Sequence, residues 1–131
     1  MIAADTNLWA RAILGDDAKQ SPAAQKAIGQ AASSSGIFVP LLVFVELGWV
    51  LGSAPGWASI QVHEALDRIL NMEGVEVENG SLARDALAFS TGAVGLADNL
   101  IALATKARGC TKLLTFDARL AKTGRAVLLK T

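Results

Sequence analysis

The 131 residues suffice for one folded domain, because a chain of this size buries roughly two-thirds of its unfolded surface. Apolar residues make up 52% of the sequence and charged residues 18%, which excludes an intrinsically disordered chain. The formal net charge is zero, and the single cysteine, Cys110, excludes an internal disulfide and a cysteine-based zinc cage.

Apolar stretches of strand length alternate with amphipathic helical stretches, which is the pattern of an α/β protein with a mostly parallel sheet. We expect about five strands, at residues 1–4, 37–39, 75–77, 112–116 and 126–129. We expect about seven helices, beginning near residues 8 and 21 and then covering residues 40–51, 59–71, 81–89, 96–107 and 118–122. No repeat or long linker divides them, so the sequence predicts a single domain over residues 1–131.

Asp5 and Asp117 each follow an expected strand. Ligands of open parallel sheets lie beyond these carboxyl ends, so both carboxylates are candidates for a binding site. Thr115 is two residues before Asp117 and is expected to project to the same side of its strand. The alternative role of each acid is a helix cap or turn. Thr6 or Asn7 could cap the first helix equally well, however, which leaves Asp5 without a structural explanation.

Glu46 and Asp98 are the other two candidate acids. Glu46 lies in the helix expected at 40–51, which is apolar nearly all round, and a buried ionised carboxylate needs a partner. No basic residue occurs between Lys26 and Arg68, so the partner must come from elsewhere in the fold. The alternatives are a helix rim position facing solvent for Glu46 and a dipole-complementing position in a first helical turn for Asp98.

The four acids taken together predict a metal site. Converging carboxylates repel one another unless a divalent cation holds them, and all-oxygen ligands suit Mg²⁺ or Mn²⁺. We therefore predict that Asp5, Glu46, Asp98 and Asp117 form a site for such ions, and the sequence leaves open whether the site holds one metal or two. The single histidine, His63, is interpreted as a surface or packing residue, so no nucleophilic triad can be assembled around it.

Charge is distributed unevenly along the chain. Seven basic residues and one acidic residue follow position 105, whereas five basic and eleven acidic residues precede it. The basic end of the chain could supply phosphate contacts, with Lys106, Arg119 and Lys122 as candidates. The alternative is a set of solvated helix and loop faces. No segment is apolar and long enough to span a bilayer, and we expect a cytoplasmic protein.

These motifs resemble the PIN-domain family, and in particular the VapC-type toxins of bacterial toxin–antitoxin pairs. The resemblance rests on Asp5-Thr6-Asn7, on Glu46 in its apolar helix, and on the segments 96–102 and 114–117. It covers essentially the whole chain, and the order and spacing of the motifs are fairly specific. It implies a three-layer α/β/α fold, RNA cleavage dependent on Mg²⁺ or Mn²⁺, neutralisation by a cognate antitoxin, and a homodimer.

The resemblance also implies roles for individual residues. The metal ligands would be Asp5, Asp98 and Asp117. Glu46 would be a ligand through water or would orient the attacking water. Supporting hydrogen bonds would come from Thr6, Asn7 and Thr115.

Two departures from the family pattern keep other functions open. Many relatives carry an acid where this chain has Gly95, and Asn99 replaces a small apolar residue. Both changes would weaken a second metal site. They support the alternative of a catalytically weak module that holds RNA or a protein. A separate alternative is another PIN nuclease, which acts in RNA processing or on DNA.

Overall fold

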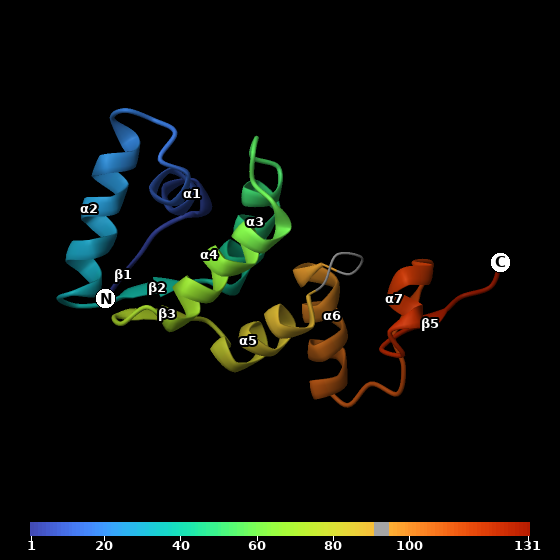
Figure 1. Cartoon of the computed structure of the whole chain (residues 1–131). Coiled ribbons are helices and arrows are strands. Elements are labelled where there is room, and N and C mark those ends of the chain that lie inside the picture. The colour runs from blue at the N-terminus through green and yellow to red at the C-terminus, as the bar shows by residue number, and fades with distance from the viewer. Residues whose placement is uncertain (91–94) are drawn as a thin grey trace. The chain divides into compact units, whose positions relative to one another are not determined.

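The computed structural model describes residues 1–90 and 95–131, which divide into two compact units (Figure 1). Unit 1 is Met1–Gly80 and unit 2 is Ser81–Thr131. The described residues form seven helices and five strands, and every strand pair is parallel, which confirms the α/β prediction. The strands form one sheet of three strands and one of two, instead of a single sheet of about five. That residues 1–131 act as one domain stays a prediction.

Unit 1 is built on a parallel sheet with the strand order β1-β2-β3. Its elements are β1 (Ile2–Ala3), α1 (Thr6–Leu14), α2 (Gln20–Ala32), β2 (Ile37–Val39), α3 (Leu41–Gly52), α4 (Ser59–Asn71) and β3 (Val75–Val77). The central strand β2 pairs Ile37 with Ile2 on one side and with Val75 on the other. β1 is therefore an edge strand of this sheet, and Asp5 follows its carboxyl end.

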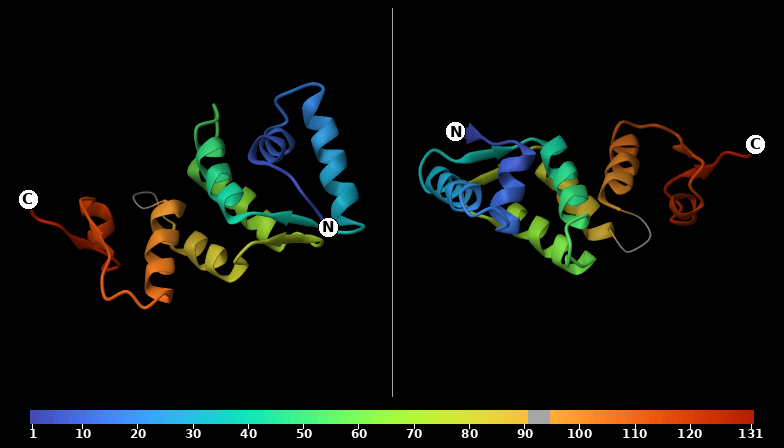
Figure 2. Two further views of the ribbon diagram at one scale, coloured as in Figure 1. Left: turned by 180° about the vertical axis from the view of Figure 1, so that it is seen from behind. Right: turned by 90° about the horizontal axis from the view of Figure 1, so that it is seen from above.

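The core of unit 1 lies where α1 contacts α2 and α3 and where α3 contacts α4 (Figure 2). Its largest buried side chains include Trp9, Phe44, Leu47, Leu51 and Leu66, each at most 2% exposed. Two of these come from neighbouring helices and three from α3 alone. This burial fixes the rotation of α3 and with it the position of Glu46.

The turn between α4 and β3 depends on a glycine. Gly74 has a φ of +81°, in the left-handed region that glycine adopts without steric cost. A Cβ at this position would overlap the backbone of Ala32, at the end of α2. The carbonyl of Gly74 also accepts a hydrogen bond from the N–H of Ile37 at 2.9 Å, which aligns the starts of β2 and β3. Close approach of two backbones therefore requires glycine here.

Unit 2 contains α5 (Gly80–Phe89) from its second residue onward, and then α6 (Leu96–Ala107), β4 (Leu114–Thr115), α7 (Ala118–Lys122) and β5 (Val127–Leu128). β4 and β5 pair in parallel, and α7 connects them. The buried side chains of Leu120 and Ala126 pack with Leu113 beside this small sheet. Asp117 follows the carboxyl end of β4, the position that Asp5 has after β1.

Several elements begin and end where the sequence predicted them, namely 37–39, 59–71, 75–77, 96–107 and 118–122. The strands expected at 112–116 and 126–129 are shorter, because only two residue pairs align between β4 and β5. Among the described helices, none has the length and apolar character needed to cross a membrane.

Candidate active site

Asp5 is the N-cap of α1. Its backbone is extended, and its Oδ1 accepts a hydrogen bond from the N–H of Leu8 at 3.0 Å. The prediction that Thr6 or Asn7 caps a helix starting near Leu8 is therefore wrong. The helix begins at Thr6 because the Asp5 carboxylate satisfies a first-turn N–H that has no carbonyl partner within the helix. The cap uses Oδ1 and leaves Oδ2 of this exposed side chain outside the bond.

Glu46 is hydrogen-bonded to the residue that follows Asp5. The hydroxyl of Thr6 donates to Oε1 of Glu46 at 2.9 Å, across 40 residues of sequence. This bond joins the first turn of α1 to the middle of α3 and holds the half-buried Glu46 side chain in place. Its partner is an uncharged hydroxyl, and Oε2 lies outside the bond. In unit 1 the N–H of Leu8 therefore orients the carboxylate of Asp5, and the hydroxyl of Thr6 orients that of Glu46.

Unit 2 holds the other two acids. Asp98 lies half-buried in the first turn of α6, where a negative charge is favoured by the helix dipole. Asp117 is the N-cap of α7, and its Oδ1 accepts from the N–H groups of Arg119 at 2.8 Å and Leu120 at 3.3 Å. The hydroxyl of Thr115 accepts the N–H of Asp117 at 2.9 Å. The Asp117 carboxylate is thus fixed in the same way as that of Asp5, with Oδ2 outside the cap.

The other predicted residues have less defined surroundings. Asn7 is exposed in the first turn of α1 and lines, with Asp5 and Arg11, a cavity of about 430 Å³. Arg119 and Lys122 are exposed on α7, and Lys106 lies in the last turn of α6. Their predicted contacts with phosphate stay predictions.

The chemistry of these donors fits Mg²⁺ or Mn²⁺. Asp5, Glu46 and Asp117 each use one carboxylate oxygen in a bond that orients the group, and each presents its second oxygen as a hard ligand. Taken by itself, neither unit gathers three acidic, histidine or cysteine side chains within its described residues. The binding of such ions by all four acids therefore stays a prediction.

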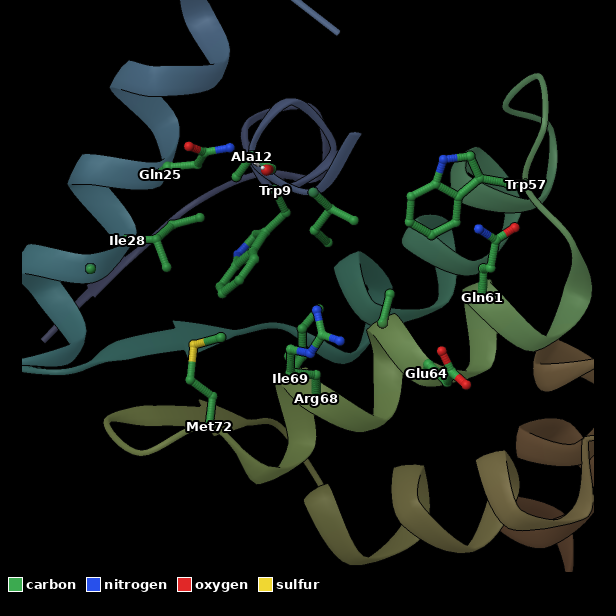
Figure 3. A pocket seen from close by; sticks show the side chains of 13 residues that line it. Trp9, Ala12, Gln25, Ile28, Trp57, Gln61, Glu64, Arg68, Ile69 and Met72 are labelled. Carbon is green, nitrogen blue, oxygen red and sulfur yellow. Dashed lines mark hydrogen bonds between the residues drawn. The ribbon is translucent and has the colours of Figure 1, made fainter. Parts of the chain in front are cut away.

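A second cavity of unit 1 has a different character (Figure 3). It measures about 510 Å³ and lies among α1, α2 and α4, with Trp9, Trp57 and Ile69 in its wall and Arg68 beside them. None of the four candidate acids lines it. The indole N–H of Trp9 has no hydrogen-bond partner among the described residues. The wall of this cavity is mostly apolar, and its one carboxylate, that of Glu64, is fewer than a metal site needs.

Asn99 has a structural role that the sequence did not indicate. Its side chain is fully buried, accepts from Nη1 of Arg125 at 2.8 Å and donates to the hydroxyl of Ser90 at 3.4 Å. The Arg125 guanidinium also lies 4.2 Å from the centre of the Phe89 ring. The burial of a polar group in α6 requires such partners. The contact spans 26 residues, so helical periodicity alone could not have revealed it.

Comparison with known proteins identifies the family. The PIN domain family matches residues 2–126, and the chain belongs to this family. Among solved structures, the chain is similar to one described as the crystal structure of VapBC2 from Rickettsia felis bound to a DNA fragment from their promoter. The identity is 20%, the match covers 98% of each chain, and the TM-score is 0.43. No curated protein matches the chain.

Proposed function

We propose that the chain is a divalent-metal-dependent endoribonuclease and the toxin of a toxin–antitoxin pair. Membership of the PIN domain family supports a nuclease. The observation that carries the proposal is the bond from Thr6 to Glu46 beside the capping carboxylate of Asp5. The cap of α1 explains why Asp5 is ordered, but no cap or turn explains why Glu46 is held in place. The ordering of Glu46 therefore supports a ligand site.

In this proposal, Asp5, Asp98 and Asp117 hold Mg²⁺ or Mn²⁺, and Glu46 binds through water or orients the attacking water. The bound ion would lower the pKa of a water molecule and stabilise charge at the scissile phosphodiester. The protein side chains supply orientation, because the two helix caps and the Thr6 hydroxyl restrict the rotamers of three carboxylates. A covalent intermediate is not required.

The experiment that tests this function is cleavage of a structured RNA by the purified chain. We expect cleavage in Mg²⁺ or Mn²⁺. Excess EDTA should abolish the cleavage, because the carboxylates would then have no ion to hold, and restoring the metal should restore it. Products are separated on a denaturing gel, and a boiled sample is the control. Equal cleavage with and without EDTA would contradict the metal dependence.

The hydroxyl of Thr6 gives a more specific test. In Thr6→Val the shape is retained but the bond to Glu46 is lost, and we expect cleavage to fall about 10- to 100-fold, the usual effect of removing a group that orients a ligand. Thr6→Ser keeps the hydroxyl and should retain most of the activity. The rate is measured at saturating RNA for both variants. Equal rates for the valine and serine variants would show that the bond is not used.

A cognate antitoxin, a homodimer and a cytoplasmic location belong to the same proposal. The tail of the antitoxin would cover the acidic site and present an arginine to it, because bidentate arginine–carboxylate pairs are strong. An antitoxin that binds the chain but leaves RNA cleavage unchanged would contradict this part.

The alternative of a weak binding module rests on Gly95 and Asn99. The burial of Asn99 and its bond to Arg125 explain this residue by packing within unit 2. Asn99 therefore does not favour a binding module over an enzyme. Gly95 is the exposed N-cap residue of α6.

A further inference from the structure

Unit 2 contains a cavity, the unit 2 cavity, that gathers positive charge. It measures about 450 Å³ and lies between the end of α6, the segment that leads into β4 and the turn before β5. The described residues that line it include three cations, Lys106, Lys112 and Arg125, and no acidic side chain. Three positive charges around one hollow favour an anionic ligand.

Arg125 is held in place before any ligand binds. One of its terminal nitrogens donates to the buried Asn99 at 2.8 Å, and the guanidinium lies over the ring of Phe89 at 4.2 Å. Both partners are uncharged, so neither of them offsets the positive charge of the guanidinium. A guanidinium carries five N–H donors, and the bond to Asn99 uses only one nitrogen. The Arg125 side chain has therefore already lost part of its conformational entropy in the fold, so ordering it costs less when a ligand binds.

The two lysines add mobile charge at the same cavity. Lys106 and Lys112 are exposed, and within residues 1–90 and 95–131 the structure has one ion pair, which joins Arg11 to Asp16 in unit 1. Neither lysine is therefore neutralised by a described carboxylate. An arginine fork with lysine charges beside it suits the tetrahedral oxygens of a phosphate.

We propose that the unit 2 cavity binds a backbone phosphate of RNA, with Arg125 as the oriented donor and Lys106 and Lys112 as charge contacts. The choice of RNA as the source of the phosphate rests on the proposed function. The structure adds Lys112 and Arg125 to the expected contact Lys106, whereas Arg119 and Lys122 are not among the described residues of the cavity wall. Phosphate contacts of this kind position a nucleic acid without reading its sequence.

The test measures binding of a fluorescein-labelled single-stranded RNA by anisotropy, in EDTA so that no cleavage occurs, over a range of NaCl concentrations. Each lost contact with single-stranded nucleic acid lowers the slope of log K against log salt by about 0.7. For Lys106→Gln with Lys112→Gln we therefore expect a slope smaller by about 1.4. Circular dichroism verifies that the double variant is folded.

The matched control is Lys19→Gln with Lys26→Gln, which removes the same charge from exposed positions in unit 1. We expect this variant to keep the wild-type slope. If both double variants lose the same slope, binding follows net charge alone and the proposal is wrong. An unchanged slope in the cavity variant also overturns it.

A free phosphate ion is the other source of the same chemistry. We therefore titrate inorganic phosphate into the isotopically labelled protein and follow the amide signals of Thr111 and Gly124. Saturable shifts by phosphate, with no change of RNA salt slope in the cavity variant, would assign the cavity to a small anion and overturn the RNA proposal. Competition of phosphate with the RNA, lost in the cavity variant, supports it.

The same measurements separate this proposal from the nuclease proposal. A chain that cleaves RNA in Mg²⁺, but whose salt slope ignores Lys106 and Lys112, keeps its proposed function and loses the cavity proposal. If the salt slope depends on both lysines but the chain cleaves no RNA in Mg²⁺ or Mn²⁺, the cavity proposal is kept and the nuclease proposal is lost.

Discussion

Replacing Asp5 by asparagine is expected to reduce metal-dependent RNA cleavage by more than about 100-fold, because the loss of a ligand should exceed the 10- to 100-fold effect of losing an outer contact. The variant should stay folded. Asparagine is as good an N-cap as aspartate, so the bond to the N–H of Leu8 can be retained while the negative charge is removed. Initial rates at several Mn²⁺ concentrations measure the effect.

Two further variants separate the charge of Asp5 from its role as a cap. Asp5→Ala removes both, so it should lose the same activity and also about 1 kcal/mol of stability. Asp67→Asn changes an exposed acid of α4 by the same chemistry and should leave cleavage unchanged. Wild-type activity in Asp5→Asn would show that Asp5 serves α1 as a cap and does not bind the metal.

Asp5 also shows where interpretation of the sequence was limited. The position of Asp5 after a strand indicates a candidate ligand, and a helix cap is its alternative role, but Thr6 and Asn7 are equally good candidates for the cap. All three residue types cap helices well, so composition does not choose among them. The choice is made by backbone geometry, which is extended at Asp5 and helical from Thr6 onward.

Periodicity was sufficient for elements with strong boundaries. The helices at 59–71 and 96–107 and the strand at 37–39 were predicted to the residue. The second of these helices is followed by Gly109, whose φ of +89° suits the end of a helix. Apolar spacing and turn residues agree in these segments, and local signals then fix the structure.

Helix α3 shows why the buried face of a helix is harder to predict than the presence of the helix. It is apolar nearly all round, and helical spacing alone predicts that Leu42, Val43 and Trp49 share a face with Glu46. In the structure Val43 is buried, whereas Leu42 is 68% and Trp49 62% exposed. A helix without a polar face carries no periodic signal for its rotation. Contacts of α3 with α1 and α4 set its rotation about its own axis. That rotation brings Glu46 to the hydroxyl of Thr6.

The second large effect is expected on stability. We expect Gly74→Ala to destabilise unit 1 by about 2–5 kcal/mol, from about 1–2 kcal/mol for a left-handed backbone and about 1–3 kcal/mol for an added methyl group without space. The methyl group would overlap the backbone of Ala32 and disturb the bond from Ile37 to Gly74. All three tryptophans lie in unit 1, so urea unfolding followed by tryptophan fluorescence reports on this unit.

Gly56 provides a control with almost the same backbone. Its φ is +79°, compared with +81° for Gly74, but no heavy atom lies within 4 Å of a Cβ at Gly56. Gly56→Ala should therefore lose only the conformational part, about 1–2 kcal/mol. The difference between the two variants measures the close approach of α2 to the start of β3. Equal losses would mean that this approach relaxes freely, and that the sheet carrying Asp5 does not depend on it.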